Sequence, residues 1–225
     1  MEFDIIKQID EHLEKKEWAS KERDYFHVSE LGKAPWIIYN NIKNPKAKKF
    51  TPRVKRVLDL GNSVHELLNK YLVEMGILIS SEITAVENEL FHGRADCIIK
   101  CPDADPKEGN LYVLEIKSCS QWVFNSLKDA SAEYQSQLQF YMYYLGIPRG
   151  MILYMNKDNC NLKQFNYELD VEFVESKIKD FKELKEKIVN NIEPPKECSC
   201  GDSWCEICGK KAPVAKSTKF LKDYD

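Results

Sequence analysis

The sequence predicts an α/β (α+β) fold with one central mixed β-sheet flanked by helices. Apolar residues recur at helical spacing in three segments, 54–77, 130–146 and 171–192. Short β-prone segments separate them, at 83–93, 94–100, 111–118, 150–156 and 162–170. Helices that alternate with small groups of strands are typical of a sheet covered by helices, which is why we expect a single sheet.

The elements can be assigned in chain order from the N-terminus. Residues 3–18 show a loose helical pattern, and Ser29 is the expected N-cap of a second helix that runs through Ile42, with Pro35 tolerated in its first turn. Residues 44–53 contain two prolines and are expected to form a loop. Residues 101–110 are expected to close a hairpin between two strands, and Gly146 is expected to end the helix before it.

Composition limits the classes of protein that the chain can belong to. It has 225 residues, a net charge of −3 and 43% hydrophobic residues, which suits a globular domain with a substantial core. No run of about 18 apolar residues is present, so we expect no membrane association. The charged N-terminus lacks the apolar segment of a signal peptide, so we expect a cytoplasmic protein of a bacterial, archaeal or phage-infected cell, with cysteines as thiols or metal ligands.

A cluster of positive charge lies in the N-terminal part despite the acidic total. Seven basic residues and no acidic one lie between residues 40 and 57: Lys43, Lys46, Lys48, Lys49, Arg53, Lys55 and Arg56. Such a run is usually a solvated loop. It is also how a local patch on an acidic protein guides a polyanion, so we consider these residues candidate contacts to DNA phosphates.

The strand LYVLEIKS carries two opposite charges inside an apolar run. Glu115 and Lys117 are two apart and share one face, whereas Leu114 and Ile116 face the other side. If residues 94–100 pair with this strand, Asp96 converges on Glu115, and two repelling carboxylates are good ligands for a hard divalent cation. The alternative is a buried Glu–Lys pair with Asp96 as a turn carboxylate.

Two helices bring further candidates to the same place. His65 lies at the edge of the apolar face of the 54–77 helix, where it is either a packed histidine or a metal ligand. Gln137 and Tyr141 are four apart on the 130–146 helix and lie on the same side. A buried amide such as that of Gln137 needs polar partners, which core packing alone does not supply. Glu89 is a further acid shortly before Asp96.

The candidate residues follow one another along the chain in a fixed order. They are His65, then GRADCII with Asp96, then LEIKS with Glu115 and Lys117, and then QLQFY with Gln137 and Tyr141. This ordered set resembles the PD-(D/E)XK nuclease superfamily, specifically its RecB-like branch, which includes phage exonucleases and the CRISPR-associated adaptation nucleases. The resemblance implies a restriction-endonuclease-like core. One departure is Ala95, which stands where the family pattern has a proline.

The resemblance also implies a role for each residue. His65, Asp96, Glu115 and the Ile116 carbonyl would hold one or two Mg²⁺ or Mn²⁺ ions, Lys117 would be the catalytic lysine, and Gln137 and Tyr141 would position the DNA and the site. The expected activity is DNA phosphodiester hydrolysis on single strands or duplex ends, in recombination, repair, or phage- or CRISPR-related processing, with possible protein partners in a recombination or replication complex. Alternatives are a non-catalytic DNA-binding scaffold, or a restriction-type or RNA-directed nuclease.

The C-terminal part carries a second candidate metal site. Cys198, Cys200, Cys205 and Cys208 form a CxC followed by a CxxC, which can surround one ion tetrahedrally. The CRISPR-associated nucleases combine one N-terminal with three C-terminal cysteines around an iron–sulfur cluster, but here no cysteine precedes Cys97. A Zn²⁺ site is therefore expected, with a [4Fe–4S] cluster or reduced thiols as alternatives. The expected division is a helical segment with the basic loop (1–53), a nuclease core (54–193) and a cysteine-rich tail (194–225).

Overall fold

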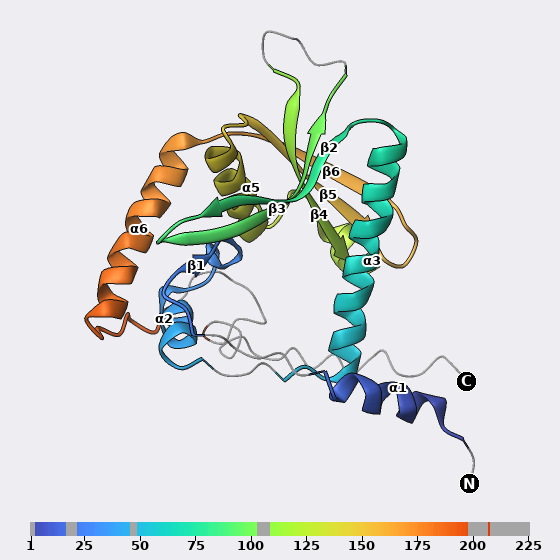
Figure 1. Ribbon diagram of the computed structural model, residues 1–225, viewed down its shortest axis with the longest axis horizontal. Helices are drawn as coiled ribbons and strands as arrows, with labels where there is room; N and C mark the ends of the chain where they lie inside the picture. Colours follow the sequence, from blue (N-terminus) through green and yellow to red (C-terminus); the bar gives the residue numbers. More distant parts are fainter. Residues whose placement is uncertain (1–2, 17–21, 46–48, 103–108, 198–206, 208–225) are drawn as a thin grey trace.

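A single mixed β-sheet with helices on both faces forms the centre of the molecule (Figure 1), as the sequence predicts. The structure, a computed structural model, describes residues 3–16, 22–45, 49–102, 109–197 and 207. The sheet contains β1 (Phe26–His27), β2 (Leu78–Glu87), β3 (Phe91–Lys100), β4 (Leu111–Cys119), β5 (Arg149–Asn156) and β6 (Leu162–Glu168). Their order is β1-β3-β4-β5-β6, and β2 also pairs with β3. The β1–β3 and β4–β5 pairs are parallel and the other pairs antiparallel.

The helices begin and end where the local chemistry favours it. They are α1 (Ile5–Glu14), α2 (Pro35–Lys43), α3 (Pro52–Glu74), α4 (Gln121–Ser126), α5 (Ala132–Leu145) and α6 (Val171–Val189). The side chains of Thr51, Ser131 and Asp170 accept hydrogen bonds from the first turns of α3, α5 and α6. Gly146 ends α5 in the left-handed conformation, as expected from its position. Within the described residues, no helix has the length and hydropathy that a membrane span needs.

Two apolar layers cover the two faces of the sheet. The larger layer packs α2, α5 and α6 against the sheet and includes Ile38, Phe140 and Phe181. The smaller layer packs Val64, Leu68 and Leu72 of α3 against Leu114 and Ile116 of β4, among others. Leu114 and Ile116 therefore lie on the side of β4 away from its charged face, as expected, and α3 covers them.

The boundary between β2 and β3 differs from the expected one. Residues 83–93 and 94–100 were expected as separate strands, with the break at Gly93. The break instead lies at Asn88, whose Oδ1 accepts hydrogen bonds from the backbone N–H groups of Leu90 and Phe91. Asparagine forms such turns through its own side chain. Gly93 lies within β3, where a Cβ would come within 2.5 Å of Val28 and 2.8 Å of Tyr141. The glycine therefore permits close packing rather than a turn.

The N-terminal part also differs in detail. Ser29 does not cap α2: it lies in a short 3-10 helix, Val28–Glu30, and α2 begins at Pro35 with Ala34 as its N-cap. Proline fits the first helical position because its missing N–H has no partner there in any case. Residues 26–39 contribute Phe26, Val28 and Ile38 to the larger apolar layer. The short α4 between β4 and α5 was not expected from the sequence.

Candidate active site

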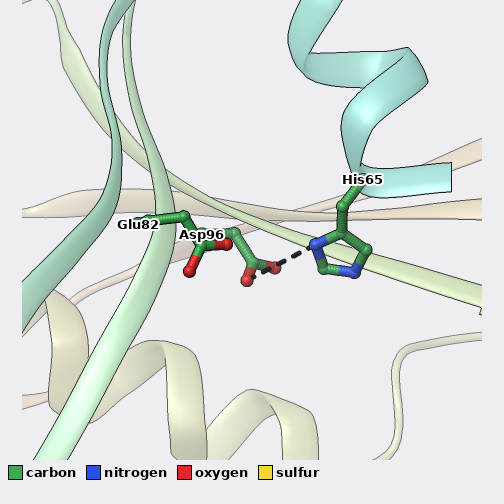
Figure 2. A group of neighbouring side chains, drawn as sticks. All are labelled: His65, Glu82 and Asp96. Atoms are coloured by element: carbon green, nitrogen blue, oxygen red, sulfur yellow. Dashed lines mark ion pairs between the residues drawn. The ribbon is translucent and has the colours of Figure 1, made fainter. Parts of the chain in front are cut away.

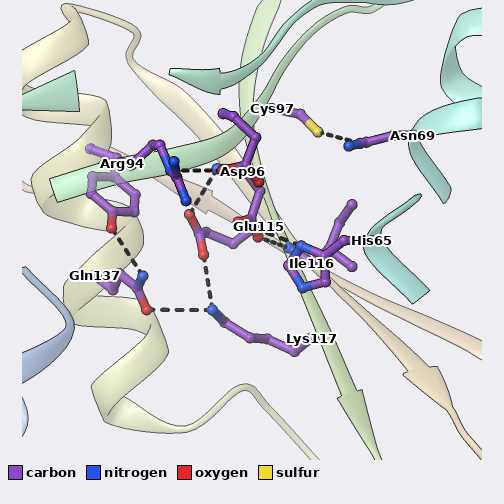
Figure 3. A network of polar contacts seen from close by, with 11 residues as sticks. His65, Asn69, Arg94, Asp96, Cys97, Glu115, Ile116, Lys117 and Gln137 are labelled. Atoms are coloured by element: carbon purple, nitrogen blue, oxygen red, sulfur yellow. Dashed lines mark hydrogen bonds and ion pairs between the residues drawn. The ribbon is translucent and has the colours of Figure 1, made fainter. Parts of the chain in front are cut away.

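Two neighbouring strands part at the charged centre of β4. The β3–β4 pairing extends from Lys100 with Leu111 to Cys97 with Leu114, and ends there. Side chains replace the backbone pairing beyond this point (Figure 3). The Ile116 N–H donates to Asp96 Oδ2 at 2.8 Å, and the Asp96 N–H donates to Glu115 Oε1 at 3.4 Å. The predicted convergence of Asp96 and Glu115 is therefore present in the structure, at a fork in the sheet.

Buried Glu115 and partly buried Lys117 form an ion pair at this fork. Lys117 Nζ lies 2.9 Å from Glu115 Oε2. Burial raises the pKa of Glu115, and the ammonium of Lys117 opposes part of that rise. Burial lowers the pKa of Lys117, but the carboxylates of Glu115 and Asp96 outweigh it and leave that pKa above its ordinary value. The short contact therefore joins the Lys117 ammonium to the carboxyl group of Glu115, both held on one face of β4.

Helix α5 supplies polar partners for this pair. Lys117 Nζ donates to Gln137 Oε1 at 3.4 Å, and Gln137 Nε2 donates to the Tyr141 hydroxyl at 3.0 Å. The ammonium also lies 4.6 Å from the centre of the Tyr134 ring. Burial raises the pKa of Tyr141, so this hydroxyl stays protonated. The side-chain amide of Gln137 therefore has the polar partners that a buried amide needs, namely Lys117 and Tyr141.

Helix α3 brings His65 to the other side of the fork. His65 Nδ1 lies 3.6 Å from Asp96 Oδ1. One turn further along α3, Asn69 Oδ1 accepts a hydrogen bond of 2.9 Å from the Cys97 thiol, which ties the helix to β3 beside Asp96. The two carboxylate oxygens of Asp96 thus have different partners: Oδ2 accepts a hydrogen bond from the Ile116 N–H of β4, and Oδ1 faces His65.

Glu82 is a member of the site that sequence reasoning missed. Figure 2 shows it on the strand beside Asp96, with His65 reaching toward both from α3. One ligand atom from each of His65, Glu82 and Asp96 lies within 4.8 Å of the others. Glu115 is not a member of this group. Glu82 was missed because the sequence predicted a strand over residues 83–93, which left Glu82 outside it. With the turn at Asn88, Glu82 lies within β2 and opposite Asp96.

Glu89 does not lie beside Asp96. It falls in the turn between β2 and β3, where its carbonyl accepts a hydrogen bond from Lys185.

The donor set fits a hard divalent cation. Carboxylate oxygens are the preferred ligands of Mg²⁺ and Mn²⁺, and an imidazole adds a nitrogen donor. His65, Glu82 and Asp96 come from three elements and point into one space (Figure 2). Glu115 and Ile116 lie on the β4 side of Asp96, where Ile116 already contacts its carboxylate.

The basic residues divide by their partners. Lys55 is buried and its Nζ donates at 2.5 Å to the carbonyls of Leu13 and Lys16, at the end of α1. Arg56 pairs with Asp10, and Lys43 donates to Asn191. Lys49 and Arg53 are exposed.

Six of the residues considered from sequence fall outside the described part of the chain. They are Lys46 and Lys48 of the basic loop, and Cys198, Cys200, Cys205 and Cys208 of the cysteine-rich tail. The expected DNA contacts and metal ligands at these positions therefore stay predictions.

No protein-family model matches the chain, and no curated protein matches it significantly. Solved structures do match its shape. An alkaline exonuclease, LHK-Exo from Laribacter hongkongensis, has 14% sequence identity, covers 83% of this chain and 94% of its own, and has a TM-score of 0.56. LHK-Exo in complex with dAMP has 17% identity over 75% and 91% of the two chains, with a TM-score of 0.54. The chain thus shares the fold of an exonuclease.

Proposed function

We propose that this chain is a metal-dependent nuclease of the RecB-like type that hydrolyses DNA phosphodiester bonds, as an exonuclease on single strands or duplex ends. The observation that carries the proposal is the fork, where Asp96, Glu115 and Lys117 meet beside His65. A buried Glu–Lys pair by itself can be purely structural. Here the pair adjoins a second carboxylate and an imidazole, which is the donor set of a metal-dependent hydrolase.

His65, Asp96, Glu115 and the Ile116 carbonyl are the residues that would hold one or two Mg²⁺ or Mn²⁺ ions. When bound, such an ion polarises the phosphoryl group and lowers the pKa of a coordinated water. Lys117 carries the positive charge that stabilises negative charge developing on the phosphate. Glu115 and Gln137 hold its ammonium in place, and Tyr141 holds Gln137, so α5 acts on the reaction through the position of Lys117.

The fold neighbours support a nucleic-acid substrate. LHK-Exo is an exonuclease, and one of its structures contains dAMP. Lys49 precedes α3 and Arg53 lies in its first turn, and both are exposed. DNA phosphates bound there would lie near the start of the helix that carries His65. The Cys198, Cys200, Cys205 and Cys208 cluster would bind Zn²⁺ in a structural role. A broad absorption band near about 400 nm in anaerobically purified protein would instead identify an iron–sulfur cluster.

The decisive experiment is a nuclease assay on end-labelled single-stranded DNA, duplex DNA, closed circular DNA and RNA, with Mg²⁺, Mn²⁺ or EDTA. We expect release of mononucleotides from linear DNA with either metal and none with EDTA. Lys117→Ala should lower the rate by about 10²–10³-fold, as expected for loss of a group that stabilises transition-state charge. Lys177→Ala, a partly exposed lysine of α6 that pairs with Asp180 far along the chain from the site, is the matched control.

Two outcomes would overturn the proposal. Cleavage that survives Lys117→Ala would place the chemistry elsewhere. An intact chain that binds DNA but cleaves no substrate with any metal would favour the non-catalytic scaffold.

A further inference from the structure

Glu82 lies directly across the sheet from Asp96. In the antiparallel β2–β3 pair, Ser81 faces Cys97 and Ile83 faces Ala95, which places Glu82 opposite Asp96 between them. Facing carboxylates on adjacent strands repel each other and destabilise a sheet. Glu82 also has a φ of 54°, which side chains other than glycine rarely adopt and which costs free energy within a strand. A cation bound between the two carboxylates would offset this repulsion.

The surroundings of Glu82 include one cation and one imidazole. Arg94 Nε lies 2.7 Å from Glu82 Oε2, in an ion pair whose side chains are 66% and 49% exposed. His65 approaches from α3 on the opposite side, so that its nitrogen, a Glu82 oxygen and an Asp96 oxygen all lie within 4.8 Å of one another (Figure 2). The three ligands come from α3, β2 and β3, so their meeting does not follow from sequence proximity.

Glu115 belongs to a different part of the fork. Both of its oxygens are engaged, one by the Asp96 N–H and one by Lys117, and its side chain is buried on the side of α5. Asp96 connects the two parts, because Oδ2 bonds to the Ile116 N–H and Oδ1 faces His65. One side of Asp96 therefore offers Glu115 and Ile116, and the other offers His65 and Glu82.

We propose that Glu82 is a metal ligand, and that together with His65 and Asp96 it forms a second divalent-cation position beside the one at Glu115 and Ile116. The inference rests on the proposed function, since it enlarges the metal centre of that same site. The Glu82 position combines two carboxylates with one imidazole. A nitrogen donor favours Mn²⁺ over Mg²⁺, which prefers oxygen ligands and gives up water reluctantly.

Arg94 provides the competing interaction for Glu82. Without a cation, its guanidinium neutralises Glu82 and reduces the repulsion from Asp96. An exposed ion pair of this kind contributes little free energy and is screened by salt. The need to break this ion pair therefore opposes cation binding only weakly. Removal of Arg94 strengthens cation binding at Glu82.

The test is a Mn²⁺ titration of the full chain, read from the electron paramagnetic resonance signal of unbound Mn²⁺ in the absence of DNA. We expect the wild type to bind a second Mn²⁺ equivalent that Glu82→Gln weakens by about tenfold or more, since even residues that only support a ligand change metal affinity by that factor. Arg94→Gln should strengthen the second equivalent by up to about fivefold. His65→Asn should reduce the preference for Mn²⁺ over Mg²⁺ in competition.

Glu74→Gln, an exposed glutamate near the end of α3, is the control and should leave the titration unchanged. A Glu82→Gln titration that matches the wild type would overturn the inference. If Glu115→Gln still abolishes cleavage in that case, the proposed function stands without Glu82. A wild-type protein that binds no Mn²⁺ and cleaves no DNA would instead contradict both this inference and the proposed function.

Discussion

The two sides of the fork differ in how far they are closed. On the α5 side, the side chains of Glu115 and Lys117 are 1% and 18% exposed, and Gln137 and Tyr141 complete a chain of polar contacts. On the α3 side, those of His65 and Glu82 are 29% and 49% exposed, and the contacts are longer or readily exchanged. Asp96 belongs to both sides.

This difference suggests a division of tasks. Charges held out of water interact strongly and keep a fixed geometry, which suits a lysine that must meet a developing charge. A cation must enter and leave, which requires ligands that water and ions can reach. If the proposed function holds, the closed side would fix the position of Lys117, and the open side would set which ion binds at Glu82 and His65.

The largest expected contrast comes from neutralising one carboxylate on each side. Glu115→Gln leaves Lys117 buried without its main counter-charge, so we expect the free energy of unfolding to fall by about 3–5 kcal/mol. Glu82→Gln should change it by no more than about 0.5 kcal/mol. Urea denaturation of both variants measures this, with Glu115→Gln/Lys117→Met expected to recover part of the loss. Equal losses of stability for Glu115→Gln and Glu82→Gln would mean that the two sides of the fork are equally closed.

The closed side should also respond to pH when Lys117 is removed. Burial raises the pKa of Glu115, and Lys117→Met removes the ammonium that opposes the rise. The folded variant then keeps a proton that the unfolded chain releases above about pH 4.3, so its free energy of unfolding falls as the pH rises, by at most about 1.4 kcal/mol per pH unit. Urea denaturation in EDTA at about pH 5 and pH 8 checks this. A loss no larger than that of Lys177→Met would contradict it.

Two glycines compare the packing of the two sides. Gly93→Ala would place a Cβ 2.5 Å from Val28 and 2.8 Å from Tyr141, so we expect a loss of about 1–3 kcal/mol. Gly61→Ala, in α3, meets only Ser118 at 3.7 Å, so it should gain about 0.5–1 kcal/mol from helix propensity. Thermal unfolding of the two variants measures both changes in stability. A stabilised Gly93→Ala would mean that Tyr141 is loosely packed.

The smallest effect is expected from the exposed basic residues that precede the open side. Lys49→Ala and Arg53→Ala should each weaken DNA binding about equally for all sequences and reduce the slope of log K against log salt by about 1. Binding assays without divalent metal, at several salt concentrations, measure the slope, with Lys177→Ala as control. Unchanged slopes would remove these two residues from the DNA path.

Several parts of the site could be predicted because their cause is local or periodic. The two-residue repeat of a strand placed Glu115 and Lys117 on one face, and the spacing of a helix paired Gln137 with Tyr141. The hairpin between β3 and β4 brought Asp96 to Glu115. These inferences needed only the type of each element and one strand pairing.

Other parts depend on information that no local pattern contains. The position of Glu82 required the β2–β3 register, which follows from the Asn88 side chain rather than from the more conspicuous Gly93. Lys55 belongs to a basic run, yet its ammonium is buried against α1, an element about forty residues away. Charge counted along a sequence does not reveal which side chains already have partners.

The two-residue strand β1 has a consequence for where the chain can be shortened. Phe26 packs edge-on against Phe181 and beside Phe91, and Val28 occupies the space that Gly93 leaves. A fragment that starts near residue 54 would uncover these rings and the backbone next to Tyr141. Any minimal version of the protein for expression or crystallisation must therefore begin ahead of Phe26, even though every candidate metal ligand at the fork lies after residue 60.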